Sequence, residues 1–320
     1  MLTKVLFAIG VILIALVMSF FGLKEVVATM MTANIFLITV AVLLQLLILA
    51  LLALRIILIA KKYGKIGFVE AFKISMAGIA ISLLTPIAKI GGEPLKIYLL
   101  RKRLGVSKAT AVIAVDTIAE LVSSLLMIFL VFIIFAKDVP GVIFSSFAIF
   151  LVIVAALLLG LLKLLLNPGW MRRIIKWLGR NMVKFAKVNK KDYAKLFYNA
   201  FRLLIRDKKI MLYAFGVSFA TKIIEFVRMW IVFAAIGIFL PPGVVIILWS
   251  VILVLYLVPW LPGSLGLVEF FGTGTLIFFG TASGAAAGGL LIDRFISFWF
   301  VLIFGLLIAT TMKLPKKVRR

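Results

Sequence analysis

The chain has 320 residues, of which 65% are hydrophobic and 15% charged, and its mean hydropathy is +1.28. This composition excludes an ordinary soluble domain and predicts an all-α, polytopic membrane protein. The 36 Lys and Arg against 11 Asp and Glu give a formal charge of +25, but no basic stretch is interleaved with stacking aromatics, so nucleic-acid binding is not expected. The chain contains neither Cys nor His. We therefore expect no disulfide, no thiolate or histidine catalysis, no metal site and no cofactor.

The first two apolar stretches, 6–23 and 34–60, each have the length of a transmembrane helix. The first lacks a small-residue cleavage site, so we interpret it as a retained signal-anchor helix. In the second, Gln45 lies at mid-depth, and Arg55 lies close enough to the end to extend its guanidinium to the interface.

The next apolar stretch, 74–84, is too short to cross a bilayer and runs into Pro86. Basic clusters stand on both sides of the break that ends at Glu93. Cytoplasmic loops are rich in Lys and Arg, so this pattern predicts a hairpin that enters and leaves on the cytoplasmic side.

The stretch 109–136 predicts a long helix that carries Asp116 and Glu120 on one face, because they are four residues apart. A short outer turn at 137–141 and a returning helix at 142–166 follow.

The polar segment 167–209 contains 13 Lys and Arg and has apolar residues at near-helical spacing. We interpret it as one or two amphipathic helices on the cytoplasmic membrane surface. The alternative is a solvated helical linker. The segment 167–209 divides a single integral membrane domain, 1–320, into a first half, 1–166, and a second half, 210–320.

The second half begins with a long helix, 210–240, in which Lys222, Glu225 and Arg228 are spaced to pair along one side. The stretches 244–261 and 268–279 flank a Pro/Gly break. No Lys or Arg occurs between Arg228 and Arg294, so no cytoplasmic loop is expected there, and these stretches predict a hairpin from the outer face.

The last helix is expected at 290–312, after a Gly/Ala-rich lead from 280 to 289. The expected outer loops hold only Lys24 and Lys137 as basic residues. The chain is therefore expected in the cell membrane as a multi-pass protein with about six full crossings and both termini in the cytoplasm.

The two halves have the same order: a long helix, a re-entrant hairpin and a long helix. Pro86 and Glu93 are seven residues apart, as are Pro262 and Glu269. Opposed hairpins in an inverted repeat are the plan of many transporters, which hold substrate where the broken helices meet. We therefore expect an inverted repeat, in which Glu93 and Glu269 share one site.

An ionisable side chain inside a bilayer costs roughly 3 kcal/mol, so these carboxylates need partners or a function. They are expected to line a polar cavity and to bind a cationic group or a proton; the alternative is that each caps the amides of its broken helix. For the other acids and for Arg228 and Arg294 the alternative is an interhelical ion pair, and for the basic residues beside the first break it is ordinary positive-inside charge. The candidate cavity residues are Glu93, Glu269, Pro86, Lys89, Gly91, Gly92, Lys96, Arg101, Pro262, Gly263, Gly266, Asp116, Glu120, Glu225, Arg228, Asp293 and Arg294.

Three motifs carry a resemblance to a known family. They are Pro86 to Arg101 with Gly91-Gly92-Glu93-Pro94, Leu261 to Glu269 with Pro262-Gly263-Ser264-Leu265-Gly266, and Arg294 to Trp299 with Gly305. On these residues the chain resembles the flippase-like transmembrane region of the lysylphosphatidylglycerol synthases, as a stand-alone member without the synthase domain. It departs from that pattern at Ser264, where the family often has Gly, and at Thr117, where an Arg would be expected after Asp116.

The resemblance implies a lipid flippase that moves a phospholipid or a lipid-linked head group between leaflets. Its expected partners are membrane lipids with anionic or phosphate head groups. No room remains for an aminoacyl-transferring domain, so synthase activity is not expected. Two alternatives stay open: a membrane-embedded enzyme that modifies a lipid, and a scaffold that docks a separate lipid-modifying enzyme on 167–209.

Overall fold

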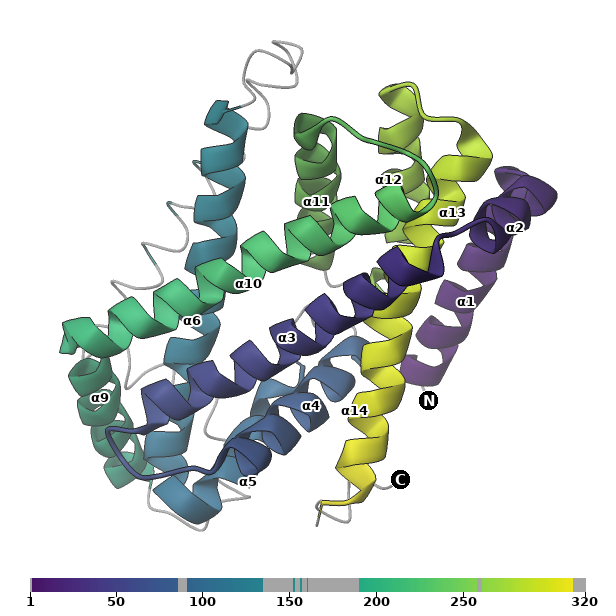
Figure 1. Ribbon diagram of the computed structural model, residues 1–320. Helices are drawn as coiled ribbons and strands as arrows, with labels where there is room; N and C mark the ends of the chain where they lie inside the picture. Colours follow the sequence, from purple (N-terminus) through teal and green to yellow (C-terminus); the bar gives the residue numbers. More distant parts are fainter. Residues whose placement is uncertain are drawn as a thin grey trace. The chain divides into compact units, whose positions relative to one another are not determined.

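A computed structural model describes residues 2–85, 91–134, 190–257 and 261–312, together with positions 152, 156 and 160. Every regular element in this part of the chain is a helix (Figure 1), which confirms the all-α prediction. Four helices are long and apolar enough to cross a membrane: Ile35–Ala60, Val106–Leu130, Lys208–Ala235 and Ser283–Thr310. The protein is therefore a multi-pass helical membrane protein.

These four helices correspond to four of the six predicted crossings, and the apolar α1 (Leu2–Phe20) lies where the first crossing was predicted. The sixth, 142–166, lies largely outside the described residues, as do the turn 137–141, the segment 167–189 and the tail 313–320.

The helix order of the first half is long, short, short, long. It consists of α3 (Ile35–Ala60, 26 residues), α4 (Phe68–Leu84, 17), α5 (Glu93–Leu104, 12) and α6 (Val106–Ile134, 29). Asn34 sets the start of α3, because its Oδ1 accepts hydrogen bonds from the amides of Phe36 and Leu37 at 3.0 and 3.2 Å.

The second half repeats this order with similar lengths. It consists of α10 (Lys208–Ala235, 28 residues), α11 (Pro242–Leu257, 16), α12 (Leu267–Phe278, 12) and a final long helix over Ser283–Thr310 (28). The short helices flank the two predicted breaks, and a 3₁₀ turn, η3 (Pro262–Ser264), occupies the second. The repeated order supports the predicted repeat, and its inversion stays a prediction.

The final long helix is built from α13 (Ser283–Arg294), a π-helical turn, η4 (Phe295–Phe300), and α14 (Val301–Thr310). It begins at Ser283, so the prediction of a helix from 290 was wrong. The Gly/Ala-rich lead is helical because it forms a close contact with α2 (Leu23–Met31). A Cβ on Gly284 would collide with Glu25, and one on Gly288 would press on Thr29.

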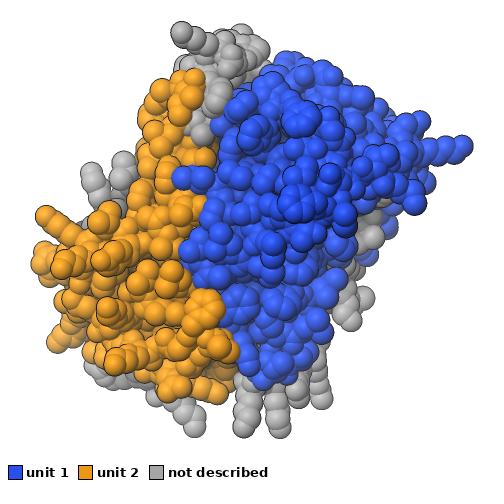
Figure 2. Space-filling model, viewed as in Figure 1, with its two compact units in different colours: residues 1–51, 72–96, 223–320 blue, residues 52–71, 97–222 orange. Residues whose placement is uncertain are grey.

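The chain divides into two compact units (Figure 2). Unit 1 comprises residues 1–51, 72–96 and 223–320, and unit 2 comprises residues 52–71 and 97–222. One core cluster of unit 1 contains Ala80 of α4, Leu265 of the second break and Phe298 of η4. The first hairpin therefore shares a core with the second break. Helix α1 also lies against this break, because a Cβ on Gly10 would collide with Leu265.

In unit 2, α9 (Lys190–Arg206) packs along α6. The rings of Tyr193, Phe197 and Phe201 stack in sequence, with centroid distances of 6.5 and 5.7 Å, and all three side chains are buried. Phe197, Phe201 and Leu204 are among the apolar residues of the segment 167–209, and their helix face is buried within the protein. The location of this segment on the membrane surface stays a prediction.

Candidate functional site

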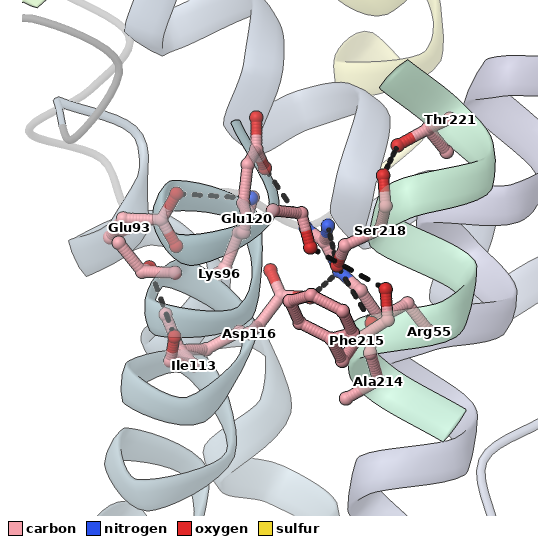
Figure 3. Close-up of polar contacts among 12 residues, drawn as sticks. Arg55, Glu93, Lys96, Ile113, Asp116, Glu120, Ala214, Phe215, Ser218 and Thr221 are labelled. Atoms are coloured by element: carbon pink, nitrogen blue, oxygen red, sulfur yellow. Dashed lines mark hydrogen bonds and ion pairs between the residues drawn. The ribbon is translucent and has the colours of Figure 1, made fainter. Parts of the chain in front are cut away.

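The first break joins α4 to α5 through a tight glycine contact in unit 1. Ser82 Oγ accepts a hydrogen bond from the Gly92 amide at 2.8 Å, and a Cβ on Gly92 would collide with the Gly78 carbonyl oxygen. The aliphatic part of Lys96 lies against Gly78, where any side chain would displace it. The Lys96 ammonium pairs with Glu93 Oε1 at 3.0 Å (Figure 3). The cation for this carboxylate therefore comes from the same helix, one turn later.

The second break, also in unit 1, has an unusual backbone. Gly263, Ser264 and Gly266 all have positive φ, at 57°, 51° and 81°. This region is costly for a residue with a Cβ, and Ser264 is the one such residue with positive φ in the described chain. Its Oγ donates a hydrogen bond to the Leu255 carbonyl at 2.8 Å, which ties the break to the end of α11.

Glu269 uses both carboxylate oxygens to hold the second break. Oε2 accepts a hydrogen bond from the Gly266 amide at 2.7 Å, and Oε1 accepts one from Arg294 Nε at 2.9 Å. The Arg294 guanidinium also donates to the Gly263 carbonyl at 2.8 Å and to the Tyr256 hydroxyl. Arg294 thus ties α11, the break and α12 to the final helix. This arrangement matches the alternative in which the carboxylate caps its broken helix.

A second buried pair of unit 1 joins α10 to the final helix. Arg228 Nη1 donates to Asp293 Oδ1 at 2.6 Å, and both side chains are almost fully buried. Ser297 Oγ, one turn later, contacts Asp293 Oδ2 at 3.4 Å. The interhelical ion pair considered for these residues is confirmed.

Unit 2 contains a larger buried cluster of charges (Figure 3). Arg55 Nε donates to Asp116 Oδ1 at 2.6 Å, Nη2 to Glu120 Oε2 at 2.9 Å and Nη1 to Ser218 Oγ at 2.8 Å. Glu120 Oε1 also lies 3.8 Å from the ammonium of Lys222. The prediction that Arg55 extends to the interface was wrong: its side chain is 1% exposed, because α6 presents two carboxylates to it.

The buried Arg–Asp pairs occupy equivalent places in the two halves. Arg55 is twenty residues after the first residue of α3, and Arg228 is twenty after the first residue of α10. Asp116 and Asp293 each stand ten residues after the start of the last long helix of their half. This agreement concerns both position and contact, so it supports the repeat more strongly than the spacings of Pro and Glu.

The predicted cavity residues fall into separate groups. Gly91, Gly92, Glu93 and Lys96 lie together at the first break, and Pro262, Gly263, Gly266, Glu269 and Arg294 lie together at the second. Each break carboxylate has its own cation, so a site shared by Glu93 and Glu269 stays a prediction.

The remaining candidates lie elsewhere. Arg101 stacks on the Tyr98 ring at 3.9 Å, and Pro86 and Lys89 lie outside the described residues. Glu225 lies on α10, where its neighbours Lys222 and Arg228 have carboxylate partners on other helices.

Sequence reasoning missed Arg55, Tyr256 and Ser82 as members of these groups. A signal for Arg55 existed: two carboxylates four residues apart in an apolar helix require a nearby cation. For Tyr256 and Ser82 the sequence offers no such signal, since a lone hydroxyl in an apolar helix is common.

Outside the membrane-spanning helices, the turn after α3 is tied to α9 in unit 2. The Tyr63 hydroxyl donates to the Ala200 carbonyl at 2.6 Å, and burial raises the pKa of Tyr63 to about 12. Lys62 pairs with Asp207 at 2.7 Å, and this hydrogen bond lowers the pKa of Asp207 below its usual value. Burial likewise raises the pKa of Tyr193, whose hydroxyl lies 2.9 Å from that of Thr110.

Long apolar helices, two pairs of short helices around breaks, and charges buried in pairs define a multi-pass membrane protein of the broken-helix class. The chain belongs to the family of the lysylphosphatidylglycerol synthase transmembrane region, which residues 2–305 match.

Relatives of similar length come from archaea. A UPF0104 membrane protein of Methanothermobacter thermautotrophicus is 26% identical over 94% of this chain and 93% of its own. A second protein of the same name and organism is 28% identical over 71% of this chain and 69% of its own. A UPF0104 membrane protein of Pyrococcus horikoshii is 23% identical over 97% of both chains.

Proposed function

We propose that this protein is a lipid flippase, which moves a phospholipid or a lipid-linked head group between leaflets. The observation that carries the proposal is the presence of two helix breaks, each with a carboxylate–cation pair that is partly or fully buried. Broken helices in repeated halves are how many transporters hold a substrate within the membrane. Membership of a family described by a lipid synthase's transmembrane region supports a lipid as the substrate.

Within this proposal the first break is the part that contacts substrate. Both carboxylate oxygens of Glu269 hold the second break, whereas Glu93 pairs with Lys96 of its own helix. The Lys96 ammonium at this break carries charge that suits a phosphate group. The expected partners are therefore phospholipids with anionic or phosphate-bearing head groups, and no enzyme activity is expected.

A proteoliposome assay tests the proposal. We expect the protein to accelerate the movement of labelled phosphatidylglycerol or of a polyprenyl-phosphate lipid across the bilayer, and Glu93→Gln to slow it at least about tenfold. The matched control is Glu70→Gln, because Glu70 lies outside both breaks and pairs with the exposed Arg103. Movement no faster than in protein-free liposomes would contradict the flippase, and a normal rate for Glu93→Gln would contradict its site.

The same liposomes separate the two other functions. A membrane-embedded enzyme would change the mass of the lipid, which mass spectrometry detects. A scaffold would leave transport to its partner, so the purified protein would move no lipid. If the basic segment only docks a partner, removing residues 167–189 abolishes that docking alone. This deletion keeps α9, which packs on α6.

The proposed orientation places both termini and the first hairpin on the cytoplasmic side and the second hairpin on the outer side. The chain has no Cys, so single cysteines report accessibility without background. We expect Lys102→Cys, after the first break, to react with an impermeant maleimide only from inside. Phe278→Cys, at the end of α12, is expected to react only from outside; both positions are exposed. Labelling of both from the same side would contradict the opposed hairpins.

A further inference from the structure

Helix α9 lies beside α6 in unit 2 (Figure 1), at the ends of three membrane-spanning helices. Near its start, the Tyr193 hydroxyl lies 2.9 Å from that of Thr110, in the first turns of α6. In its middle, the Ala200 carbonyl accepts the hydrogen bond from Tyr63, just after the end of α3. Asp207 follows its last residue and directly precedes α10. These three ends therefore lie on one side of the membrane, and α9 runs along that surface.

The apolar side chains of α9 lie in two sectors around the helix axis. The stacked rings of Tyr193, Phe197 and Phe201 occupy the buried sector. Leu196 and Leu203 are seven residues apart, so they lie on nearly one line along the helix, and their side chains are 55% and 49% exposed. The apolar side chains that α9 presents outward are therefore these two leucines and not the aromatic residues.

A third sector of α9 is basic. Lys195, Arg202 and Arg206 are exposed and lie within roughly 40° of one another around the axis, beside the line of leucines. Among the described side chains, none of the three pairs with a carboxylate. The nearby Asp207 is paired with Lys62. A buried face, an exposed apolar edge and a basic row beside it are the pattern of a helix in a membrane interface.

We propose that the outward face of α9 is a binding surface for anionic phospholipids of the adjacent leaflet. Leu196 and Leu203 enter the boundary between head groups and acyl chains, and Lys195, Arg202 and Arg206 bind phosphate groups. A leaflet satisfies both sectors, because it offers apolar chains and negative charge at the level where α9 lies. In the proposed orientation this is the cytoplasmic leaflet. The inference concerns a surface outside both breaks, so it goes beyond the proposed function and does not depend on it.

The test uses the full-length protein in liposomes of equal parts phosphatidylcholine and phosphatidylglycerol. The chain has no Cys, so Leu203→Cys carries a single environment-sensitive fluorophore. Bromine on the acyl chains of one lipid quenches a fluorophore that touches this lipid. We expect quenching by either brominated lipid, and quenching by brominated phosphatidylglycerol that is at least about twofold stronger, because the basic row enriches it locally. The same fluorophore on Lys65→Cys, in the exposed turn after α3, is expected to be quenched far less.

Charge variants separate recognition from folding. Replacing Lys195, Arg202 and Arg206 by Gln is expected to make the two brominated lipids quench about equally, with the depth of the fluorophore unchanged. Exchanging Lys for Arg and Arg for Lys at these positions keeps the charge and is expected to keep the preference. The matched control removes three charges from exposed positions outside α9 and is expected to keep the preference as well: Lys61→Gln, Lys65→Gln and Lys102→Gln.

Each possible result decides the inference. A fluorophore at position 203 that neither brominated lipid quenches would overturn it, because the face would then meet water or a soluble acidic partner. Equal quenching with the basic row intact would overturn the anionic lipid as the ligand. The same loss of preference in the matched control would overturn the assignment to α9. Quenching as expected in a protein that moves no lipid would contradict the proposed function and leave this inference standing.

Discussion

At the scale of single residues, the departures from the family pattern have a structural meaning. Ser264 adopts φ 51°, a conformation that suits the glycine common in the family, and its hydroxyl bond to Leu255 offsets part of the strain. Thr117 stands where an Arg would follow Asp116, and its hydroxyl bonds only the Ile113 carbonyl of its own helix among the described contacts. In the second half Arg294 follows Asp293 and holds the break. The two breaks are therefore secured by cations from different places.

The role of Arg294 predicts a penalty for a change that keeps the charge. Arg294→Lys replaces a planar fork by a single ammonium, which cannot reach Glu269, Gly263 and Tyr256 together. We expect a loss of stability of about 2–4 kcal/mol, measured by unfolding in detergent. Arg103→Lys, at an exposed pair with Glu70, is expected to cost less than about 0.5 kcal/mol. Similar losses in the two variants would contradict the bridging role.

At the scale of elements, small residues decide which helices approach closely. The Gly/Ala-rich start of α13 fits against α2, and Gly78 and Gly92 bring α4 and α5 together. In contrast, no atom of the described residues lies within 4 Å of a Cβ built on Gly216 of α10 or on Gly274 of α12. A glycine in a helix of this chain therefore indicates close packing only where a second helix lies directly against it.

The contact between α2 and α13 predicts the effect of one added methyl group. In Gly284→Ala the new Cβ lies too close to Glu25, so we expect a loss of about 1–3 kcal/mol and faster proteolysis of α2. Gly216→Ala is the matched control, because the same methyl group meets no atom of the described residues and improves helix propensity. Equal thermal unfolding temperatures for the two variants would show that α2 does not pack as described.

The turn between α3 and α4 predicts a pH dependence at alkaline pH. The pKa of Tyr63 is raised to about 12 from about 10 in an unfolded chain, so the folded state favours the neutral phenol. The stabilisation is complete below about pH 10 and is lost as the pH rises towards 12. The ionised phenol can no longer donate to Ala200, so α9 is held less firmly.

An ultraviolet titration that compares the protein with Tyr63→Phe measures this pKa. A difference spectrum of the phenolate that appears already near pH 10 would contradict the burial of this side chain. Between about pH 10 and pH 12, the free energy of unfolding of Tyr63→Phe is expected to fall less than that of the unchanged protein.

At the scale of the whole molecule, apolar length and basic clusters were sufficient to predict the four long helices and a break between them in each half, but not the short helix α2. Hydropathy could not predict that Ser283 begins the last helix, because glycine and alanine lower the apolar signal where α2 requires small residues. The pairing of Arg55 was missed because its partners on α6 are far away in sequence and only the fold brings them together. Acids in an apolar helix were recognised as candidates, but whether each is structural or functional depends on its contacts.

The repeated Arg–Asp pair predicts how the halves respond to the loss of a carboxylate. Asp293→Asn leaves the buried Arg228 beside a neutral amide, at an expected cost on the order of 3–5 kcal/mol. Asp116→Asn is expected to cost less, because Glu120 lies 2.9 Å from Arg55 and keeps it paired. Unfolding of both variants in detergent measures the difference, and a larger cost for Asp116→Asn would contradict the role of Glu120 as a second partner of Arg55.

A charge exchange tests the second-half pair more directly. Arg228→Asp and Asp293→Arg each bury two like charges, so each single change is expected to be severe, and the double change restores opposite charges and recovers part of the stability. The matched exchange at the exposed pair of Lys62 and Asp207 is expected to have little effect in any combination. If the double exchange at 228 and 293 is no more stable than the sum of its single changes predicts, these residues are not coupled. The final helix would then be positioned by its apolar packing, and the charge pair would have to be retained for another reason.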